Sequence, residues 1–338
     1  MSELVSAGII GLGAGIPDRI LTNADLEKMV DTSDEWIRTR SGIRERRIAP
    51  PEVAASDLGL LASQEALAGA GLTGADLDLI IVATITPDTI FPSVSCLLQQ
   101  RLGAVKAAAY DLSAGCSGFI YGLAQACQAI ATGFHRYVLV VGVEILSKIT
   151  DWTDRGTCVL FGDGAGAAVL GPVPRGMGFI AHYLGADGNG AEYLQLPGGG
   201  SRHPASHATV DNKEHYIKMN GNEVFKFAVR IVPDAAEEVL RRAKMTKDEI
   251  TIFLPHQANT RIIESAAKRL ELPMERFYVN VDRYGNTSAA SIPIALTELD
   301  RAGRLKRGDK ILLVGFGAGL TWAASILVWS KNAREVAS

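Results

Sequence analysis

The chain has 338 residues, a length that fits one large domain or two units of ordinary size. Apolar residues make up 47 % and charged residues 21 %, which is the balance of a globular protein with a large core. The formal net charge of −3 excludes an overall basic surface, so we expect no nucleic-acid partner.

Simple patterns also argue against membrane and metal association. No apolar run is long enough to span a bilayer, and the first residues lack the charged and apolar stretches of a signal peptide. No two of the four cysteines form a close pair such as CxxC, and the six histidines lack the spacing of metal ligands. We therefore expect a cytoplasmic protein with reduced thiols, no membrane contact and no bound metal.

The N-terminal region holds one candidate nucleotide-binding feature. Trp36 and Arg40 are four residues apart on a short expected helix, capped by Ser33 or Asp34, so they share a face. An aromatic ring beside a guanidinium suits a nucleotide base and its phosphates. A solvated helix that happens to carry a tryptophan explains the same pattern equally well.

The next part of the chain alternates strand-like and helix-like segments. Residues 77–84 and 137–144 are nearly continuous apolar runs, typical of strands buried on both faces of a sheet. A helical stretch over 55–70 precedes the first of them. A third strand-like run, 107–112, leads into a small-residue turn with Cys116, and an apolar helix follows. This alternation predicts an α/β fold.

The second half of the chain repeats features of the first half. Three strand–turn units recur at a nearly constant offset of 171 to 173 residues. Residues 78–84 correspond to 249–255, Asp111 to Asp282, and Gly142 to Gly315. This repetition predicts two related halves with similar topology. We place the N-terminal half at residues 1–174 and the C-terminal half at residues 175–338.

Three polar residues fall near the ends of expected strands. Cys116 lies where a helix begins, and the free N–H groups and helix dipole there favour the thiolate, although free cysteines are often small buried side chains. His256 directly follows one strand, and Asn286 lies in the turn that corresponds to the Cys116 turn. A helix cap and a left-handed turn are the plain alternatives for these two. Because α/β proteins bind ligands at strand carboxyl ends, the three together predict a Cys/His/Asn site.

The chain resembles the β-ketoacyl-acyl-carrier-protein synthase III family along its whole length. The resemblance rests on DLSAGCSGF, FLPHQANTRII, RYGNTSAASIPIAL and GFGAGLTW, supported by DEWIRTRSGIRERRIA, DRGT, FGDGAGAAVL and GNEVFK. HQAN together with GNTSAAS is specific, because elongating synthases of the same fold carry two histidines instead. The resemblance implies a thiolase-like α/β fold, in which two pseudo-repeated halves form a five-layer α-β-α-β-α sandwich.

The resemblance also implies a reaction. A short acyl-CoA primer and malonyl-acyl-carrier protein would condense with loss of CO₂, giving a β-ketoacyl-acyl-carrier protein and starting fatty-acid synthesis. Cys116 would hold the acyl group in a ping-pong scheme, with the N–H groups of Cys116 and Gly317 as the oxyanion hole. His256 and Asn286 would donate hydrogen bonds to the enolate oxygen. No metal, flavin or nucleotide cofactor is implied.

The family resemblance assigns five residues to CoA. Trp36 and Arg155 match positions that enclose the adenine, and Arg40 matches a position near the phosphates. Gly221 and Asn259 match positions along the pantetheine arm.

Three further features of the resemblance concern partners and the acyl chain. Phe91 matches a residue that reaches the acyl pocket of a neighbouring subunit, which implies a homodimer. Residues 194–215 read as a mobile loop, which by family position lies beside the acyl tunnel. A basic face on two expected helices implies docking of the acidic acyl carrier protein, with a merely solvated face as the alternative. Its residues are Lys226, Arg230, Arg261, Lys268 and Arg269.

Three other functions stay open at this point. A condensing enzyme of the same fold could serve a polyketide or quinolone pathway. A cysteine thioester hydrolase could use a Cys/His/Asn set, although the apolar helix after Cys116 favours a dry site. A non-catalytic acyl-binding protein would have no need of all three residues. The length and branching of the primer depend on pocket depth, which residue spacing does not report.

Overall fold

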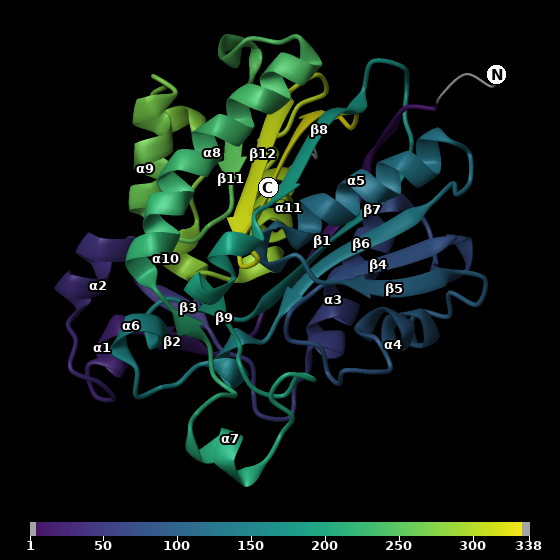
Figure 1. Cartoon of the computed structure of the whole chain (residues 1–338). Coiled ribbons are helices and arrows are strands. Elements are labelled where there is room, and N and C mark those ends of the chain that lie inside the picture. The colour runs from purple at the N-terminus through teal and green to yellow at the C-terminus, as the bar shows by residue number, and fades with distance from the viewer. Residues whose placement is uncertain (1–4, 333–338) are drawn as a thin grey trace.

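The computed structural model describes residues 5–332, in which two β-sheets alternate with three helical layers (Figure 1). The first sheet has the strand order β1-β7-β6-β4-β5, and the second has the order β11-β12-β13-β8. The expected five-layer α/β sandwich is confirmed.

The first sheet contains the continuous apolar runs of the N-terminal half. β4 (Leu79–Ala83) runs parallel to β5 (Ala108–Leu112) and β6 (Val138–Glu144). β7 (Gly164–Pro172) is antiparallel both to β6 and to β1 (Ala7–Gly15). Helices cover both faces of β4 and β6, which is why these strands have no polar alternation.

The second sheet is built from the C-terminal half. β11 (Ile252–Pro255) is parallel to β12 (Lys310–Gly317), and β13 (Thr321–Val328) lies antiparallel between β12 and β8 (Gly178–Ala186). The division expected after residue 174 falls between β7 and β8.

Long helices form the other three layers, and alternate residues of the strands serve different layers. The outer face of the first sheet carries α3 (Ala55–Ala70) and α4 (Val94–Arg101). The space between the sheets holds α5 (Gly118–Ala131) and α11 (Ser291–Arg301). The outer face of the second sheet carries α8 (Gly221–Ala243) and α9 (Thr260–Arg269). In β6, Val140 belongs to the core between the sheets and Val141 to the outer core under α3.

Short strands and helices such as β2, β3, β9, α1, α6 and α7 fill the lower part of Figure 1. The strand pairs are β2 (Ile20–Thr22) with β3 (Glu45–Arg47) and β9 (Leu194–Gln195) with β10 (Lys218–Met219). The short helices are α1 (Asn23–Leu26), α2 (Asp34–Ser41), α6 (Arg155–Cys158), α7 (His207–Asp211) and α10 (Val281–Tyr284). The 3₁₀ turns are η1 (Gly74–Asp76), η2 (Gly115–Ser117), η3 (Leu146–Ile149), η4 (Gly188–Tyr193), η5 (Lys247–Glu249), η6 (Met274–Arg276) and η7 (Ser288–Ala290).

Two local expectations differ from the structure. The strand expected ahead of Asn286 is wrong: α10 precedes the turn, and an isolated bridge between Phe253 and Phe277 stands where a counterpart of β5 was expected. The two phenylalanine rings stack with centroids 5.1 Å apart, and Tyr278 N donates to the Phe253 carbonyl at 2.9 Å, so both contacts hold this segment against β11. Residues 194–215, expected as a loop, contain β9 and the projecting helix α7.

No helix within residues 5–332 is long and apolar enough to cross a membrane.

Candidate active site

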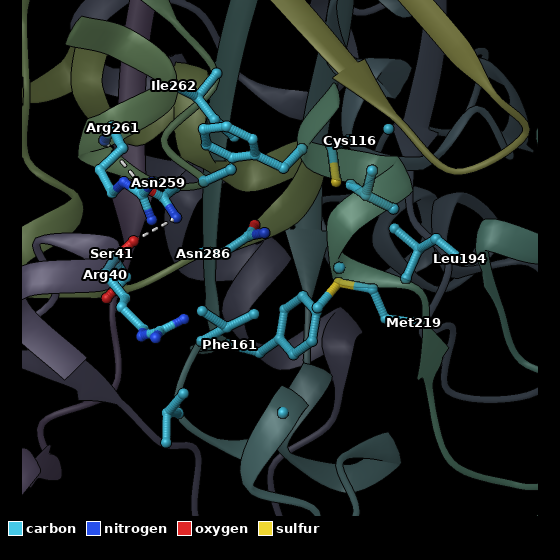
Figure 2. Close-up of a pocket in the computed structure, with 18 of the residues that line it drawn as sticks. Arg40, Ser41, Cys116, Phe161, Leu194, Met219, Asn259, Arg261, Ile262 and Asn286 are labelled. Carbon is cyan, nitrogen blue, oxygen red and sulfur yellow. Dashed lines mark hydrogen bonds between the residues drawn. The ribbon is translucent and has the colours of Figure 1, made fainter. Parts of the chain in front are cut away.

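Cys116, His256, Asn286 and Gly317 line one cavity of about 380 Å³ where the two halves meet (Figure 2). Each comes from a different element: Cys116 from η2, His256 from the end of β11, Asn286 from the turn before η7, and Gly317 from the end of β12. The structure therefore brings together all four residues that the sequence assigned to the reacting centre. The other end of the cavity is lined by Trp36.

Cys116 sits against bare backbone of the other half. A Cβ atom at Gly317 would stand 2.6 Å from the Cys116 nitrogen and 3.2 Å from its sulfur, so only glycine fits there. This contact places the backbone of β12 directly beside the sulfur, where N–H groups could bind an oxyanion.

Burial of the Cys116 side chain opposes the thiolate that the helix start was expected to favour. Burial is the largest cause that raises the pKa of the thiol to about 12; the charge of Glu144 acts in the same direction, and a side-chain contact with Ser288 acts against it. A helix start stabilises a charge by at most about 2 kcal/mol. The rise from 9.0 to about 12 corresponds to roughly 4 kcal/mol. Burial therefore favours the neutral thiol at Cys116.

His256 is a neutral imidazole held in one orientation. Its Nδ1 lies 2.7 Å from Ser291 Oγ, and its ring meets the Phe316 ring edge-on with centroids 5.3 Å apart. Ser291 Oγ already accepts the Gln257 N–H at 3.3 Å, so its own hydrogen is available for Nδ1, and we assign the ring proton to Nε2. Burial lowers the pKa of His256 to about 3. The ring can thus donate a hydrogen bond without carrying a charge.

Asn286 is fixed by its backbone and by one side-chain bond. Its N–H donates to the Leu160 carbonyl at 2.8 Å, and its carbonyl accepts from Gly162 N at 3.0 Å. The side-chain Oδ1 accepts from Ser288 N at 2.8 Å. Its Nδ2 group is left to donate towards the cavity that the residue lines (Figure 2).

The residues assigned to CoA gather at the outer end of the cavity, with one difference from the expected arrangement. Arg155 lies directly over the Trp36 ring, 4.4 Å from its centroid, and Arg40 lies 5.1 Å from the same ring. A base can lie between Trp36 and Arg155 only if the arginine moves away. Asn259 Nδ2 donates to the Arg40 carbonyl at 2.9 Å, and Gly221, at the start of α8, lines the cavity beside it.

A second, apolar cavity of about 180 Å³ opens on the other side of Cys116. Its lining is mostly aliphatic or aromatic and includes Ile85, Leu146, Ile149, Phe161, Leu194 and Ile217. Leu194 begins the segment that the sequence placed beside an acyl tunnel. Phe91, in contrast, is 84 % exposed on the surface of this chain.

Comparisons with known proteins agree with this geometry. The family models 3-oxoacyl-[acyl-carrier-protein] synthase III and its C-terminal part match residues 110–188 and 240–329. A β-ketoacyl-[acyl-carrier-protein] synthase III of Caldanaerobacter subterraneus subsp. tengcongensis is 61 % identical over 331 residues, covering 98 % of this chain and all of the relative. The chain belongs to the β-ketoacyl-acyl-carrier-protein synthase III family.

Solved structures of related enzymes show the same fold. The crystal structure of a 3-oxoacyl-[acyl-carrier-protein] synthase III from Aquifex aeolicus VF5 matches with a TM-score of 0.88 at 48 % identity, over 96 % of this chain and 100 % of that chain. The priming β-ketosynthase of the R1128 polyketide pathway matches with a TM-score of 0.91 at 37 % identity, over 99 % of both chains.

The five basic residues assigned to docking are all exposed on α8 and α9. Lys226 pairs with Glu223 at 2.7 Å, and Arg269 pairs with Asp234. Arg261 also lines the CoA end of the cavity. Over residues 5–332, no ion pair engages Arg230, Arg261 or Lys268, so these three present the freest positive charge.

Sequence reasoning missed four residues around the reacting centre. Ser291 orients His256, Phe316 packs against its ring, and Ser288 and Glu144 lie beside Cys116. Ser288 and Ser291 belong to the same GNTSAAS motif as Asn286, so that motif could have pointed to them. Glu144 could have been found as a carboxyl at the carboxyl end of an apolar strand, where α/β proteins place their sites.

We predict that His256 stays neutral across the working pH range. Because burial lowers its pKa to about 3, its ¹⁵N resonances should keep the Nε2-protonated, neutral pattern from pH 8 to pH 5. The resonances are assigned by their loss in His256→Ala. Movement towards the imidazolium position within this range would contradict the burial argument.

Proposed function

We propose that this chain condenses a short acyl-CoA primer with malonyl-acyl-carrier protein, releasing CO₂ and CoA and starting fatty-acid synthesis. The observation that carries this proposal is the meeting of Cys116, His256 and Asn286 in one cavity, whose lining also includes Trp36, Arg40 and Asn259. Membership of the synthase III family supports the same reaction.

The first half-reaction loads Cys116. Its sulfur attacks the thioester carbonyl, and the N–H groups of Cys116 and Gly317 receive the oxyanion, a contribution of about 3–4 kcal/mol per donor in comparable sites. The closeness of the two backbones supports this assignment. CoA then leaves, and the acyl group stays on sulfur, where exchange between thioesters is nearly thermoneutral.

The second half-reaction makes the carbon–carbon bond. Malonyl-acyl-carrier protein loses CO₂, and the enolate oxygen takes hydrogen bonds from His256 Nε2 and Asn286 Nδ2. Both donors are neutral, and both are held by hydrogen bonds at their other polar atoms. The carbanion attacks acyl-Cys116, and the β-ketoacyl-acyl-carrier protein leaves. This scheme uses no metal or redox cofactor.

The apolar cavity beside Cys116 supports a short acyl primer. Its walls are mostly branched aliphatic side chains and one phenylalanine, which suit a hydrocarbon. Four free cysteines, three of them buried, support a reducing compartment such as the cytoplasm.

The alternative pathways are less well supported. The priming ketosynthase of a polyketide pathway shares 37 % of its sequence with this chain, against 61 % for the synthase III of Caldanaerobacter. A cysteine hydrolase needs water beside the acyl-enzyme. Here the thiol is buried, and an apolar cavity lies next to it.

We further propose a homodimer formed through the edge of the first sheet. β5 is the edge strand of the sheet, and its residues Ala108 and Tyr110 are exposed. An unprotected edge strand can pair with a strand of another chain. Ile90 and Phe91 are 83 % and 84 % exposed in a loop after β4, the neighbour of β5. A second copy of the chain would cover this surface and bring Phe91 to its partner.

We also propose that the basic face of α8 and α9 docks the acyl carrier protein. Arg230, Arg261 and Lys268 carry the freest positive charges there, and Arg261 stands at the cavity mouth. An acidic carrier seated on this face would deliver its pantetheine arm into the cavity.

The catalytic roles predict a separation of the two half-reactions. Labelled acetyl-CoA should leave one label on the wild-type protein and none on Cys116→Ser. His256→Ala and Asn286→Ala should still acylate, but condensation should fall roughly 10²–10³-fold, because each loses one enolate donor. Condensation at the native rate in either variant would contradict the enolate assignment, and free acid as sole product would favour a hydrolase.

The dimer proposal predicts the effect of a charge on the edge strand. The wild type should show twice the chain mass by light scattering, and Tyr110→Asp should shift the protein towards the monomer, because a carboxylate at the sheet edge opposes pairing. Leu61→Asp, which changes an exposed leucine on α3, is the matched control and should remain dimeric. A monomeric wild type would refute the proposal.

The docking proposal predicts a selective change in one Michaelis constant. Arg230→Glu and Lys268→Glu should each raise KM for malonyl-acyl-carrier protein roughly five- to tenfold, about 1–1.4 kcal/mol, and leave acylation by acyl-CoA unchanged. Lys306→Glu, an exposed charge reversal outside α8 and α9, should change neither. Equal effects of all three variants would point to general electrostatics instead.

A further inference from the structure

A buried carboxyl without an assigned role lies beside the nucleophile. Glu144 is the last residue of β6 and has no exposed surface. Its oxygens accept hydrogen bonds from Thr86 Oγ1 at 2.6 Å, Ser288 Oγ at 3.0 Å and Ile85 N at 3.2 Å. No cation pairs with it among the residues that the structure describes. Burying a carboxylate without a cation costs free energy, which argues against a purely structural role for Glu144.

Ser288 connects this carboxyl to Cys116. The Ser288 hydroxyl donates to Glu144 Oε1 at 3.0 Å. Ser288 also lines the apolar cavity together with Cys116, and its side chain acts on the pKa of that thiol. Its backbone is left-handed, with φ of 47°, and its N–H is held by Asn286 Oδ1 at 2.8 Å. Ser288 thus bonds the carboxyl and shares a cavity with the sulfur. A hydroxyl that donates to a carboxylate can accept a proton from a thiol at the same time.

We propose that Glu144, acting through the Ser288 hydroxyl, receives the proton of the Cys116 thiol when Cys116 attacks the acyl-CoA. The inference rests on the proposed acylation of Cys116. As the new C–S bond forms, the S–H bond breaks and its proton passes to Ser288 Oγ, while the hydroxyl proton of Ser288 passes to Glu144. When the bond from carbon to the CoA sulfur breaks, the proton returns along the same path to that sulfur. The acyl-CoA thioester and the Cys116 thiol are thus replaced by the acyl-Cys116 thioester and the thiol of CoA.

The electrostatics of the site favour this path. Burial raises the pKa of Glu144 to about 7, which suits a base working near neutral pH. The negative charge of Glu144 raises the pKa of Cys116. Transfer of the proton to Glu144 removes that charge at the moment when the sulfur needs to become negative. The site then holds one negative charge before and after the transfer, so none has to be newly desolvated.

Among the groups packed around Glu144, Cys116 is the titratable side chain that the proposal couples to it. The turn after β4 and η7 offer hydroxyl and amide donors, and the buried residues of α3 and α5 carry no carboxyl or cationic group. Asp163, just before β7, is bound to Ser147 and to Ala49 N. Lys148, on η3, donates to the backbone carbonyls of residues 51 and 53. Asp300 is buried at the far end of α11.

The test is the rate of Cys116 acylation by acetyl-CoA in a single turnover, followed by mass spectrometry between pH 5.5 and pH 9. For the wild type we expect the rate to rise with pH through an inflection near 7, because only the ionised carboxylate accepts a proton. In Glu144→Gln, acylation at pH 7 should fall at least 100-fold, and the inflection should disappear. Glu144→Asp should restore part of the rate and the inflection.

A second variant and a control separate proton transfer from loss of structure. Ser288→Gly removes the hydroxyl and tolerates the left-handed backbone, so it should show the same loss, with no further loss in the double variant. Asp163→Asn removes another buried carboxyl at the same end of the sheet and should keep the inflection. Once acylated by long incubation, Glu144→Gln should condense with malonyl-acyl-carrier protein within about threefold of the wild-type rate.

Three outcomes would overturn the inference: acylation of Glu144→Gln at the wild-type rate, an inflection that survives in both variants, or parallel loss of both half-reactions in Glu144→Gln and Ser288→Gly. A wild type that forms no acyl-Cys116 would instead refute the proposed function itself.

Discussion

The active site depends on two close contacts in which a strand of each half packs against the turn of the other half. A Cβ atom at Gly142, in β6, would stand 2.3 Å from the carbonyl oxygen of Ala289 in η7. At Gly315, in β12, a Cβ atom would stand 3.2 Å from the Cα of Ser117 in η2. These are the two glycines that correspond in the repeat. Each strand therefore positions the turn of the opposite half, which is why the catalytic groups converge only when both halves are folded together.

The same packing decides which charges the site can hold. Excluding water from the meeting point of the halves raises the pKa of Cys116 and of Glu144 and lowers that of His256. Burial thus favours the neutral thiol, the neutral imidazole and a carboxyl poised near neutrality. Chemistry in such a place proceeds best by moving one charge among fixed partners, and this favours neutral hydrogen-bond donors for the enolate over a cation.

Much of the fold could be read from the sequence because its strongest signals are local. The apolar runs became β4 and β6, and the helix over 55–70 has the expected bounds. The helix start at Cys116 was also found, but the burial that opposes a thiolate there was not, since a local argument contains no desolvation. The hydrogen bond between Glu144 and Ser288 spans 144 residues, and no spacing rule reaches it. The missing counterpart of β5 has a similar cause, because an isolated bridge and a stack of two phenylalanines distant in sequence stand there without a full ladder of backbone hydrogen bonds.

The two halves share a scaffold but not a chemistry, and the ends of β6 and β12 show how the difference arises. These corresponding strands finish at Glu144 and at Gly317. At position 317 any side chain would collide with the backbone and sulfur of Cys116, so this strand end can offer only its N–H. At position 144 there is room for a carboxyl, which reaches the turn that carries Asn286 and Ser288. One strand end can therefore stabilise an oxyanion while the other can hold a proton, and a symmetric pair could not supply both.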